Sequence, residues 1–249
     1  MITGKLGVMQ AYFLPYLGYF QLIQAVDKFI VYGKVSFRKK SWITRNRILD
    51  AGTGLPITIQ VPVMGKSSSK LIEHVGIDNN QNWQRKLVAV IFYNYKKSPY
   101  FKEIFPFLED VMSVPTDSLH LFNAFTINKI CELLSIKTEL VFEHPEFELL
   151  EENLKSTELS NGVDVKTRRV FEICELHNFS NYINPPGGEE LYSKDLFEAN
   201  GYSIGFLLPE LPVYSQFNFD YQSHLSIVDV LMHNGINKTS KMLNDYKII

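Results

Sequence analysis

A short basic segment around Trp42 carries the side chains best suited to hold an anion. Lys40, Arg45 and Arg47 lie close together in the chain, with Asn46 between the two arginines. The planar guanidinium of arginine makes bidentate contacts with phosphate, and an indole ring stacks well on a base or a sugar. The segment therefore predicts a clamp for a diphosphate. The alternative is a solvated basic edge that keeps the margin of a sheet from pairing.

The aromatic stretch near the N-terminus is a second candidate. Its residues predicted to bind substrate are Gln10, Tyr12, Tyr16, Gly18 and Tyr19. They lie between a first predicted strand and a helix, and in parallel sheets ligands bind beyond the carboxyl ends of the strands, where helix N-termini favour anions. We expect a cradle for a phosphate group. The alternative is a close-packed turn in which Gly18 only relieves a steric clash.

Two residues near the C-terminus could act as bases. Asp229 follows Ser226 by three positions and shares a face of an otherwise apolar helix with it. A carboxylate there either projects into the site or, as the structural alternative, bonds a neighbouring loop such as residues 214–219. His224 is the best general-base candidate among the six histidines, because it directly precedes this helix. Both are predicted catalytic residues.

Gly187 and Gly188 follow Pro186 after a predicted strand. Glycines at such a place permit the backbone to approach a ligand closely, so we predict that both bind substrate. An ordinary loop also needs glycine, and that alternative stays open.

Other classes of chemistry are not indicated. The histidines show no ligand spacing with Cys131 and Cys174, so we predict no metal and no bound cofactor. The two cysteines fall in apolar stretches, which argues against a thiol nucleophile and for a reducing, cytoplasmic setting. The net charge of −2 gives no reason to expect nucleic acid as a partner, and no apolar run is long enough for membrane insertion.

Hydrophobic spacing predicts the elements that position these residues. The predicted strands cover residues 6–9, 28–32, 55–63, 71–77, 138–142, 181–183 and 202–207. The predicted helices cover residues 18–26, 83–95, 127–134, 170–177, 193–199 and 225–232, with one more beginning near residue 98. Strands that alternate with helices indicate an α/β fold, with a Rossmann-like, mostly parallel sheet and a helical lobe around residues 80–135. We expect a single domain over residues 1–249, an antiparallel insertion after residue 35, and a solvated end at residues 238–241.

Several blocks of the chain resemble the WbqC-like family, which is associated with the biosynthesis of O-antigen surface polysaccharide. The blocks are residues 9–23, 39–47, 82–101, 186–188, 212–216 and 225–229. The fourth and fifth contain Gly187, Gly188, Tyr214 and Gln216, and the resemblance adds Tyr214 and Gln216 to the predicted substrate-binding residues. Ala11 stands where the family carries proline, and Gly33-Lys34 where it carries an acidic pair.

The resemblance implies a transferase that acts on a nucleotide-linked sugar. The chemistry it suggests is acyl or aminoacyl transfer to an amino sugar, with an acyl carrier protein or a coenzyme-linked donor as the second substrate. The alternative is a non-catalytic protein that binds nucleotide sugars or assembles the pathway. The departure at Gly33-Lys34 motivates this alternative, because a lost acidic pair would leave binding without turnover.

Overall fold

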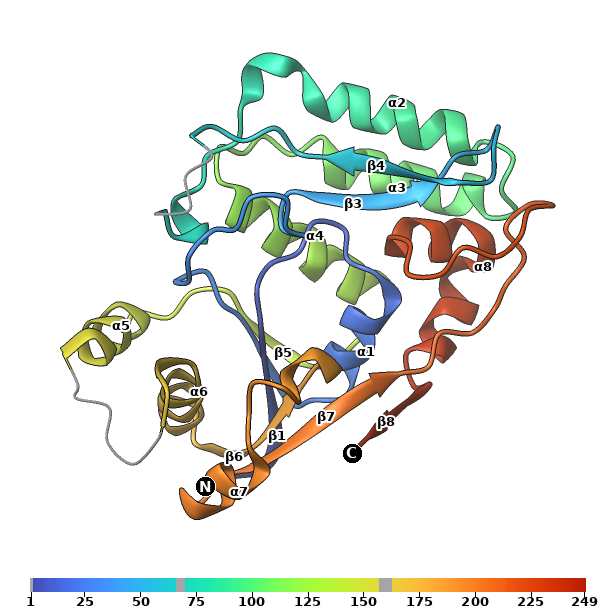
Figure 1. Ribbon diagram of the computed structural model, residues 1–249. Coiled ribbons are helices and arrows are strands. Elements are labelled where there is room, and N and C mark those ends of the chain that lie inside the picture. The colour runs from blue at the N-terminus through green and yellow to red at the C-terminus, as the bar shows by residue number, and fades with distance from the viewer. Residues whose placement is uncertain (1, 66–69, 157–162) are drawn as a thin grey trace.

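One sheet of six strands, with helices on both faces, forms the centre of the protein. The computed structural model describes residues 2–65, 70–156 and 163–249 (Figure 1). The strands are β1 (Ile2–Met9), β2 (Lys28–Val31), β5 (Glu139–Val141), β6 (Phe179–Asn184), β7 (Ser203–Pro209) and β8 (Tyr246–Ile248). They lie in the order β5-β2-β1-β6-β7-β8, and every neighbouring pair is parallel except β7 with β8. The prediction of an α/β fold with a mostly parallel sheet is confirmed.

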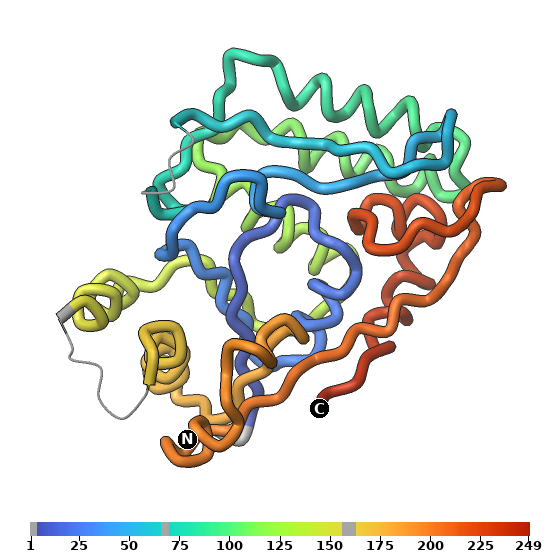
Figure 2. Tube along the Cα trace, in the orientation of Figure 1, coloured from blue at the N-terminus to red at the C-terminus, as the bar shows by residue number. Residues whose placement is uncertain are grey.

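The order of the strands reverses beside β1. From β1 the chain passes through α1 (Leu17–Gln24) to β2 on one side, and much later β6 pairs with the other side. Such a reversal leaves a crevice beyond the carboxyl ends of the two strands, and ligands of open α/β sheets bind there. Figure 2 shows the long turn that the trace makes between the end of β1 and α1, above this edge of the sheet.

Alternate residues of the central strands point to opposite sides of the sheet. Along β2, Phe29 and Val31 are buried in a larger core and Ile30 in a smaller one. The larger core includes α1 and α8 (Ile227–Met242), and the smaller one α5 (Phe147–Ser156), α6 (Val165–Leu176) and α7 (Lys194–Ala199). Because both faces are covered, these strands read as nearly continuous apolar runs in the sequence.

A lobe of helices packs on the larger core. It consists of α2 (Trp83–Tyr95), α3 (Phe101–Met112) and α4 (Leu119–Leu133), within the range where a helical lobe was predicted (Figure 1). An antiparallel pair, β3 (Arg45–Leu49) and β4 (Pro56–Gln60), lies between α2 and the turn after β1, whereas α4 packs directly on that turn. The predicted antiparallel insertion is therefore present, but its first strand comes from the basic segment.

Two predicted elements were wrong in detail, and one helix was missed. Residues 71–77 are not a strand: they contain the 3-10 helix η1 (Ile72–His74), followed by η2 (Asn79–Gln81), because Ile72, Val75 and Ile77 reach the core from a series of turns. The helix α4 begins well before residue 127, and α5 was not predicted.

The C-terminal end also differs from the prediction. Gly235 interrupts α8 with a positive φ of 67°, but the helix resumes and continues to Met242. Within residues 238–241, Thr239 is fully buried, so this segment is not a solvated end. The last residues pair with β7 as β8. Residues 66–69 lie outside the described part of the chain. No helix among the described residues is long and apolar enough to cross a bilayer.

Candidate functional site

A cavity of about 160 Å³ opens at the mouth of the sheet, where the strand order reverses. Its walls come from the end of β1, the turn that follows it, α1, the turn after β6 and the end of β7. The lining residues are Met9, Tyr12, Tyr16, Gly18, Tyr19, Leu22, Pro185, Pro186, Leu207 and Pro209. Four of the five residues predicted in the aromatic stretch therefore line one cavity. The fifth, Gln10, accepts a hydrogen bond at its backbone oxygen from the Tyr19 hydroxyl, at 2.8 Å.

The cavity is aromatic and carries no formal charge on its lining residues. Burial raises the pKa of the Tyr12, Tyr16 and Tyr19 hydroxyls, so all three stay neutral near pH 7. A Cβ atom at Gly18 would lie 2.5 Å from the Tyr16 ring, so glycine is needed for that ring to cover the start of α1. Such walls fit an uncharged ring, a base or a sugar, better than a phosphate.

Buried polar side chains hold the turn between β1 and α1 in place. The Asn46 amide donates to the backbone oxygens of Phe13 and Leu14, at 3.0 and 2.7 Å. The Asn123 amide donates to Ala11 O at 2.9 Å, and the Ser226 hydroxyl donates to Leu14 O at 2.7 Å. These bonds fix a turn that includes a left-handed Leu14 with φ of 42°. Asn46, predicted to bind substrate, thus has both amide hydrogens committed to the turn.

Asn123 was not identified in the sequence. Its amide donates a second bond, to the backbone oxygen of Ile43 at 2.8 Å, and so ties α4 to the segment before β3 as well as to the turn. The available signal was an asparagine inside an apolar helix, since a fully buried amide must find partners.

The predicted basic cluster is built on β3. Strand alternation buries Asn46 and Ile48 and leaves Arg45 and Arg47 together on the other face. Their guanidinium groups lie 5.7 and 5.6 Å from the centre of the Trp42 ring, and Trp42 is 43% exposed. No carboxylate in the described part of the chain lies within ion-pair distance of either arginine. The buried Nε of Arg47 has no hydrogen-bond partner among the described residues. Lys40 is exposed in the preceding turn, with φ of 60°.

The basic cluster lies against the same turn that forms the cavity. The backbone N–H of Phe13 donates to Trp42 O at 2.8 Å, and that of Ser226 donates to Arg47 O at 2.8 Å. Ser226 in turn forms an isolated bridge with Tyr16, a cavity residue. Backbone contacts thus join the strand that carries the two arginines to the turn that lines the cavity, whereas the arginine side chains lie on the face of β3 opposite Asn46.

His224 lies at the edge of this site. Its ring stacks on Tyr16 with the ring centres 5.8 Å apart, and it is exposed to solvent. Its Nδ1 lies 2.9 Å from Ser223 Oγ, so Nε2 is the ring nitrogen left for a substrate. The residue adopts a left-handed conformation with φ of 57°, which is costly for a side chain with a Cβ and is found mainly where the surroundings enforce it.

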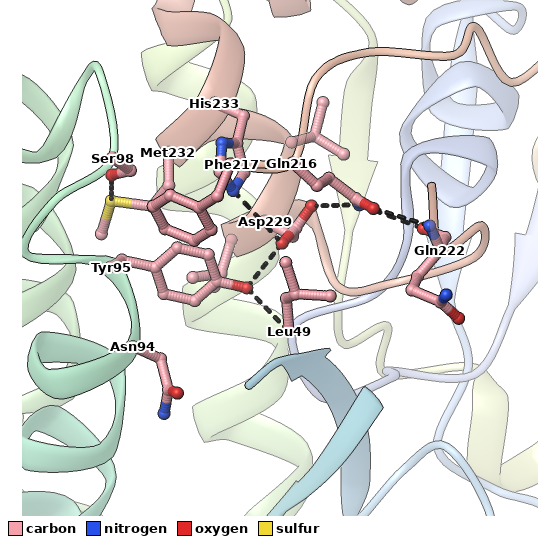
Figure 3. A network of polar contacts seen from close by, with 12 residues as sticks. Leu49, Asn94, Tyr95, Ser98, Gln216, Phe217, Gln222, Asp229, Met232 and His233 are labelled. Atoms are coloured by element: carbon pink, nitrogen blue, oxygen red, sulfur yellow. Dashed lines mark hydrogen bonds and ion pairs between the residues drawn. The ribbon is translucent and has the colours of Figure 1, made fainter. Parts of the chain in front are cut away.

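Asp229 lies in the interior of the protein, as Figure 3 shows. It is fully buried and accepts hydrogen bonds from the hydroxyls of Tyr95 and Tyr214, both at 2.7 Å, and from the Gln216 amide at 2.8 Å. Gln216 also binds the backbone of Gln222 through both ends of its side chain. These contacts match the structural alternative, a carboxylate that bonds the loop around residues 214–219. The predicted Tyr214 and Gln216 have their polar atoms committed to the same network.

The two predicted glycines lie in η3 (Pro186–Gly188), and neither lines the cavity. Gly187 is exposed, with open space where a Cβ would be. Gly188 is buried against the side chain of Asn184, which leaves no room for a Cβ. The turn reaches the cavity through Pro185 and Pro186.

Thiol and metal chemistry have no geometric support in the described residues. Burial raises the pKa of both Cys131 and Cys174 to about 12, so each stays a protonated thiol at neutral pH. No group of three or more His, Cys, Asp or Glu side chains in this part of the chain is placed to hold a metal ion.

Comparison with known proteins gives a family and one distant relative. The model of the "WbqC-like protein family" matches residues 10–241. The uncharacterized protein Rv1507c of Mycobacterium tuberculosis is 28% identical over 233 residues, which cover 93% of this chain and 94% of the relative. No solved structure matches the chain. The family match spans the turn after β1, the basic cluster and the Asp229 network alike.

Proposed function

The chain belongs to the WbqC-like protein family. We propose that it binds a nucleotide-linked amino sugar at the mouth of the sheet and transfers an acyl or aminoacyl group to the sugar amine. The observation that carries the proposal is the arginine pair on Trp42, which has no carboxylate partner in the described residues. Its strand is hydrogen-bonded to the turn that lines an uncharged, tyrosine-rich cavity. A sugar nucleotide joins the same two chemistries, a diphosphate and uncharged rings. The diphosphate would bind Arg45 and Arg47, and a ring would enter the cavity.

His224 is the group that we assign to proton transfer. The amine nitrogen of the sugar attacks the carbonyl carbon of a thioester donor, so that a C–N bond forms and the C–S bond breaks. His224 Nε2 takes the proton that the nitrogen loses and returns it to the thiolate that leaves. Asp229 has no place in this step, since it is fully buried and accepts three hydrogen bonds. The donor would be a coenzyme thioester or an acyl carrier protein.

The second candidate function is binding of nucleotide sugars without turnover. The surroundings of Lys34 favour it, because this lysine stands where the sequence comparison led us to expect an acidic pair. Its Nζ is bound by Glu73 and Glu148, and it does not line the cavity. A protein of this kind would present or assemble pathway substrates.

A two-step experiment separates these functions. First, nucleoside diphosphates and nucleotide-linked amino sugars are screened by thermal shift, since a ligand stabilises the fold by RT ln(1 + [L]/Kd). Second, each sugar nucleotide that binds is incubated with coenzyme-linked and carrier-linked acyl donors, and the masses of the products are measured by mass spectrometry. A gain in mass that is lost in His224→Gln, while the thermal shift remains, supports the transferase.

The other outcomes are equally informative. A thermal shift without any gain in mass supports the binding function and overturns the transferase. If no nucleotide ligand shifts the melting temperature, both functions fail.

A further inference from the structure

The helical hairpin of α2 and α3 forms an outer surface of the protein with an unusual composition (Figure 1). Residues 79–102 contain five lysines or arginines and no aspartate or glutamate, although the whole chain has a net charge of −2. The five cations are Arg85, Lys86, Lys96, Lys97 and Lys102. All five are exposed, and none has an ion-pair partner within the described residues. None of these five cations is therefore neutralised by an ion pair within the described residues, although α3 also carries the exposed acids Glu103, Glu109 and Asp110.

Aromatic side chains accompany the charge at the tip of the hairpin. Tyr93 is 67% exposed, and Phe92 and Tyr100 are 39% and 37% exposed. Phe92 packs against Phe101 and Phe105 of α3, with ring centres 5.6 Å apart in both pairs. The exposed rings are thus the outer part of an aromatic cluster that the two helices hold in place.

Lys96 and the exposed rings form one surface. Lys96 Nζ lies 5.9 Å from the centre of the Phe92 ring and 5.3 Å from that of Tyr93. Lysine stems cover apolar surface while their ammonium groups reach outward. We define the hairpin tip as Phe92, Tyr93, Lys96, Lys97, Tyr100 and Lys102.

We propose that the hairpin tip docks the protein on an anionic lipid surface. The ammonium groups bind the phosphates of the headgroups, and Phe92 and Tyr93 enter the interfacial layer. Tyrosine and other amphipathic rings favour that layer, and lysines near an anionic membrane add favourable electrostatic energy. Protein interfaces, by contrast, are depleted in lysine at their centres, so lipid fits this composition better than an acidic protein.

The proposal describes peripheral binding. The helices of the hairpin keep their buried faces on the core, through residues such as Leu87, Ile91 and Ile104. Only the tip is available to the interface. Binding should therefore be reversible and should weaken as salt screens the charges. The proposal does not depend on the function assigned above, because the tip shares no residue with the cavity or with the arginine pair.

Vesicle sedimentation of the full chain tests this docking. Vesicles of phosphatidylcholine alone are compared with vesicles that also contain phosphatidylglycerol, at low and at high salt. We expect binding only to the anionic vesicles, and its loss at high salt. The variant K96E/K97E should bind at least about tenfold more weakly, since each reversal removes an attraction and adds a repulsion. Tyr93→Ser should have a smaller effect in the same direction.

A matched control separates the tip from net charge alone. The variant K137E/K166E makes the same charge change at exposed lysines elsewhere. It should bind anionic vesicles like the unchanged protein. Circular dichroism checks that every variant is folded. The proposal is overturned if the unchanged protein does not bind anionic vesicles, or if both double variants lose binding equally. The first result would leave an acidic protein as the partner for this surface.

Discussion

Two groups of cations lie near the carboxyl ends of β1 and β2, and the fold treats them in opposite ways. The open cluster, Trp42 with Arg45 and Arg47, lies against the turn after β1. Its two guanidinium groups share an aromatic ring, and no carboxylate of the described chain lies within reach of either. Like charges that are held together in this way repel each other, and the Nε of Arg47 is buried without an acceptor.

The closed cluster follows β2. It consists of Lys34 with Glu73 and Glu148, and of Arg169 with Glu151 and Tyr32. Burial works against the charge of Lys34, but the hydrogen bonds that its ammonium donates to Glu148 and Glu73 prevail and raise its pKa. Hydrogen bonding to Glu151 likewise raises the pKa of Arg169. Each cation here has its own anion.

This difference indicates which cluster has a structural role. Desolvating a cation without a partner costs free energy, so a fold that needs the cation only for stability pairs it, as the closed cluster does. A site that must receive an anion leaves the cation unpaired and gives up stability for binding. We therefore expect the open cluster to bind a ligand and the closed cluster to stabilise the fold. The variants below test this division.

Removal of the central carboxylate of the closed cluster should have the largest effect. Glu151 is 8% exposed and binds both the Tyr32 hydroxyl, at 2.6 Å, and Arg169. Glu151→Ala leaves a partly buried cation without its anion, and we expect a loss of about 3 kcal/mol in the free energy of unfolding. Urea denaturation measures it. The exposed Glu175→Ala on α6 is the control. Equal losses in both variants would mean that the closed cluster does not support the fold.

The inner face of β3 gives the second test. Asn46→Leu keeps the size of the side chain but removes the donor to Phe13 O and one of the two donors to Leu14 O, so we expect a loss of about 2 kcal/mol. Nucleotide affinity should fall too, because this turn carries Tyr12 and Tyr16. Thr58→Leu, an exposed change opposite Arg47 on β4, should alter stability by less than about 0.5 kcal/mol. If Asn46→Leu is as stable as that control, the turn does not depend on the amide.

The open cluster should respond in the opposite manner. Arg45→Gln and Arg47→Gln should each weaken the binding of a nucleoside diphosphate about tenfold, the value of one charged hydrogen bond of about 1.5 kcal/mol. Without ligand, neither variant should unfold more easily, because each relieves a repulsion. Calorimetric titration and urea denaturation give the two quantities. Arg85→Gln at the exposed start of α2 is the control. A loss of stability with unchanged affinity would place the open cluster in the fold instead.

The sequence was most informative where local spacing decides the structure. The β1–α1–β2 unit and the parallel sheet followed from strand and helix periods, and they place the aromatic turn at the mouth of the sheet. The residue types around Trp42 indicated an anion site. Their placement on a strand did not follow, because a run of arginines has no apolar alternation of its own. The helix α5 was missed although Phe147, Leu150 and Leu154 have helical spacing.

Contacts between segments that are distant in the chain could not be predicted from the sequence. The Tyr95 hydroxyl binds a carboxylate 134 residues later in the chain, and the Asn123 amide binds an oxygen 112 residues earlier. Apolar spacing places such residues on a buried face, but it does not say which polar group meets them there. For this reason Asp229 could be described as structural or catalytic from the sequence, and only its three donors favour the structural alternative.

His177 provides the smallest test, since it is a base that the fold buries without an acid partner. Burial lowers its pKa from the ordinary 6.5 to about 4, Lys28 and His144 act in the same direction, and Glu139 opposes them. Between these two values the unfolded chain binds more protons than the native protein, so stability should fall as the pH decreases through this window. His177→Leu removes that dependence. At pH 8 the histidine is neutral in both the folded and the unfolded chain. Between pH 8 and pH 5, the free energy of unfolding of the variant should rise by about 1 kcal/mol relative to that of the unchanged protein. This figure is reduced for solvent screening of the partly exposed ring. Urea denaturation at several pH values measures the difference. If the free energies of unfolding of the variant and the unchanged protein depend on pH in the same way, the fold accommodates protonated His177, as it accommodates the cations of the closed cluster.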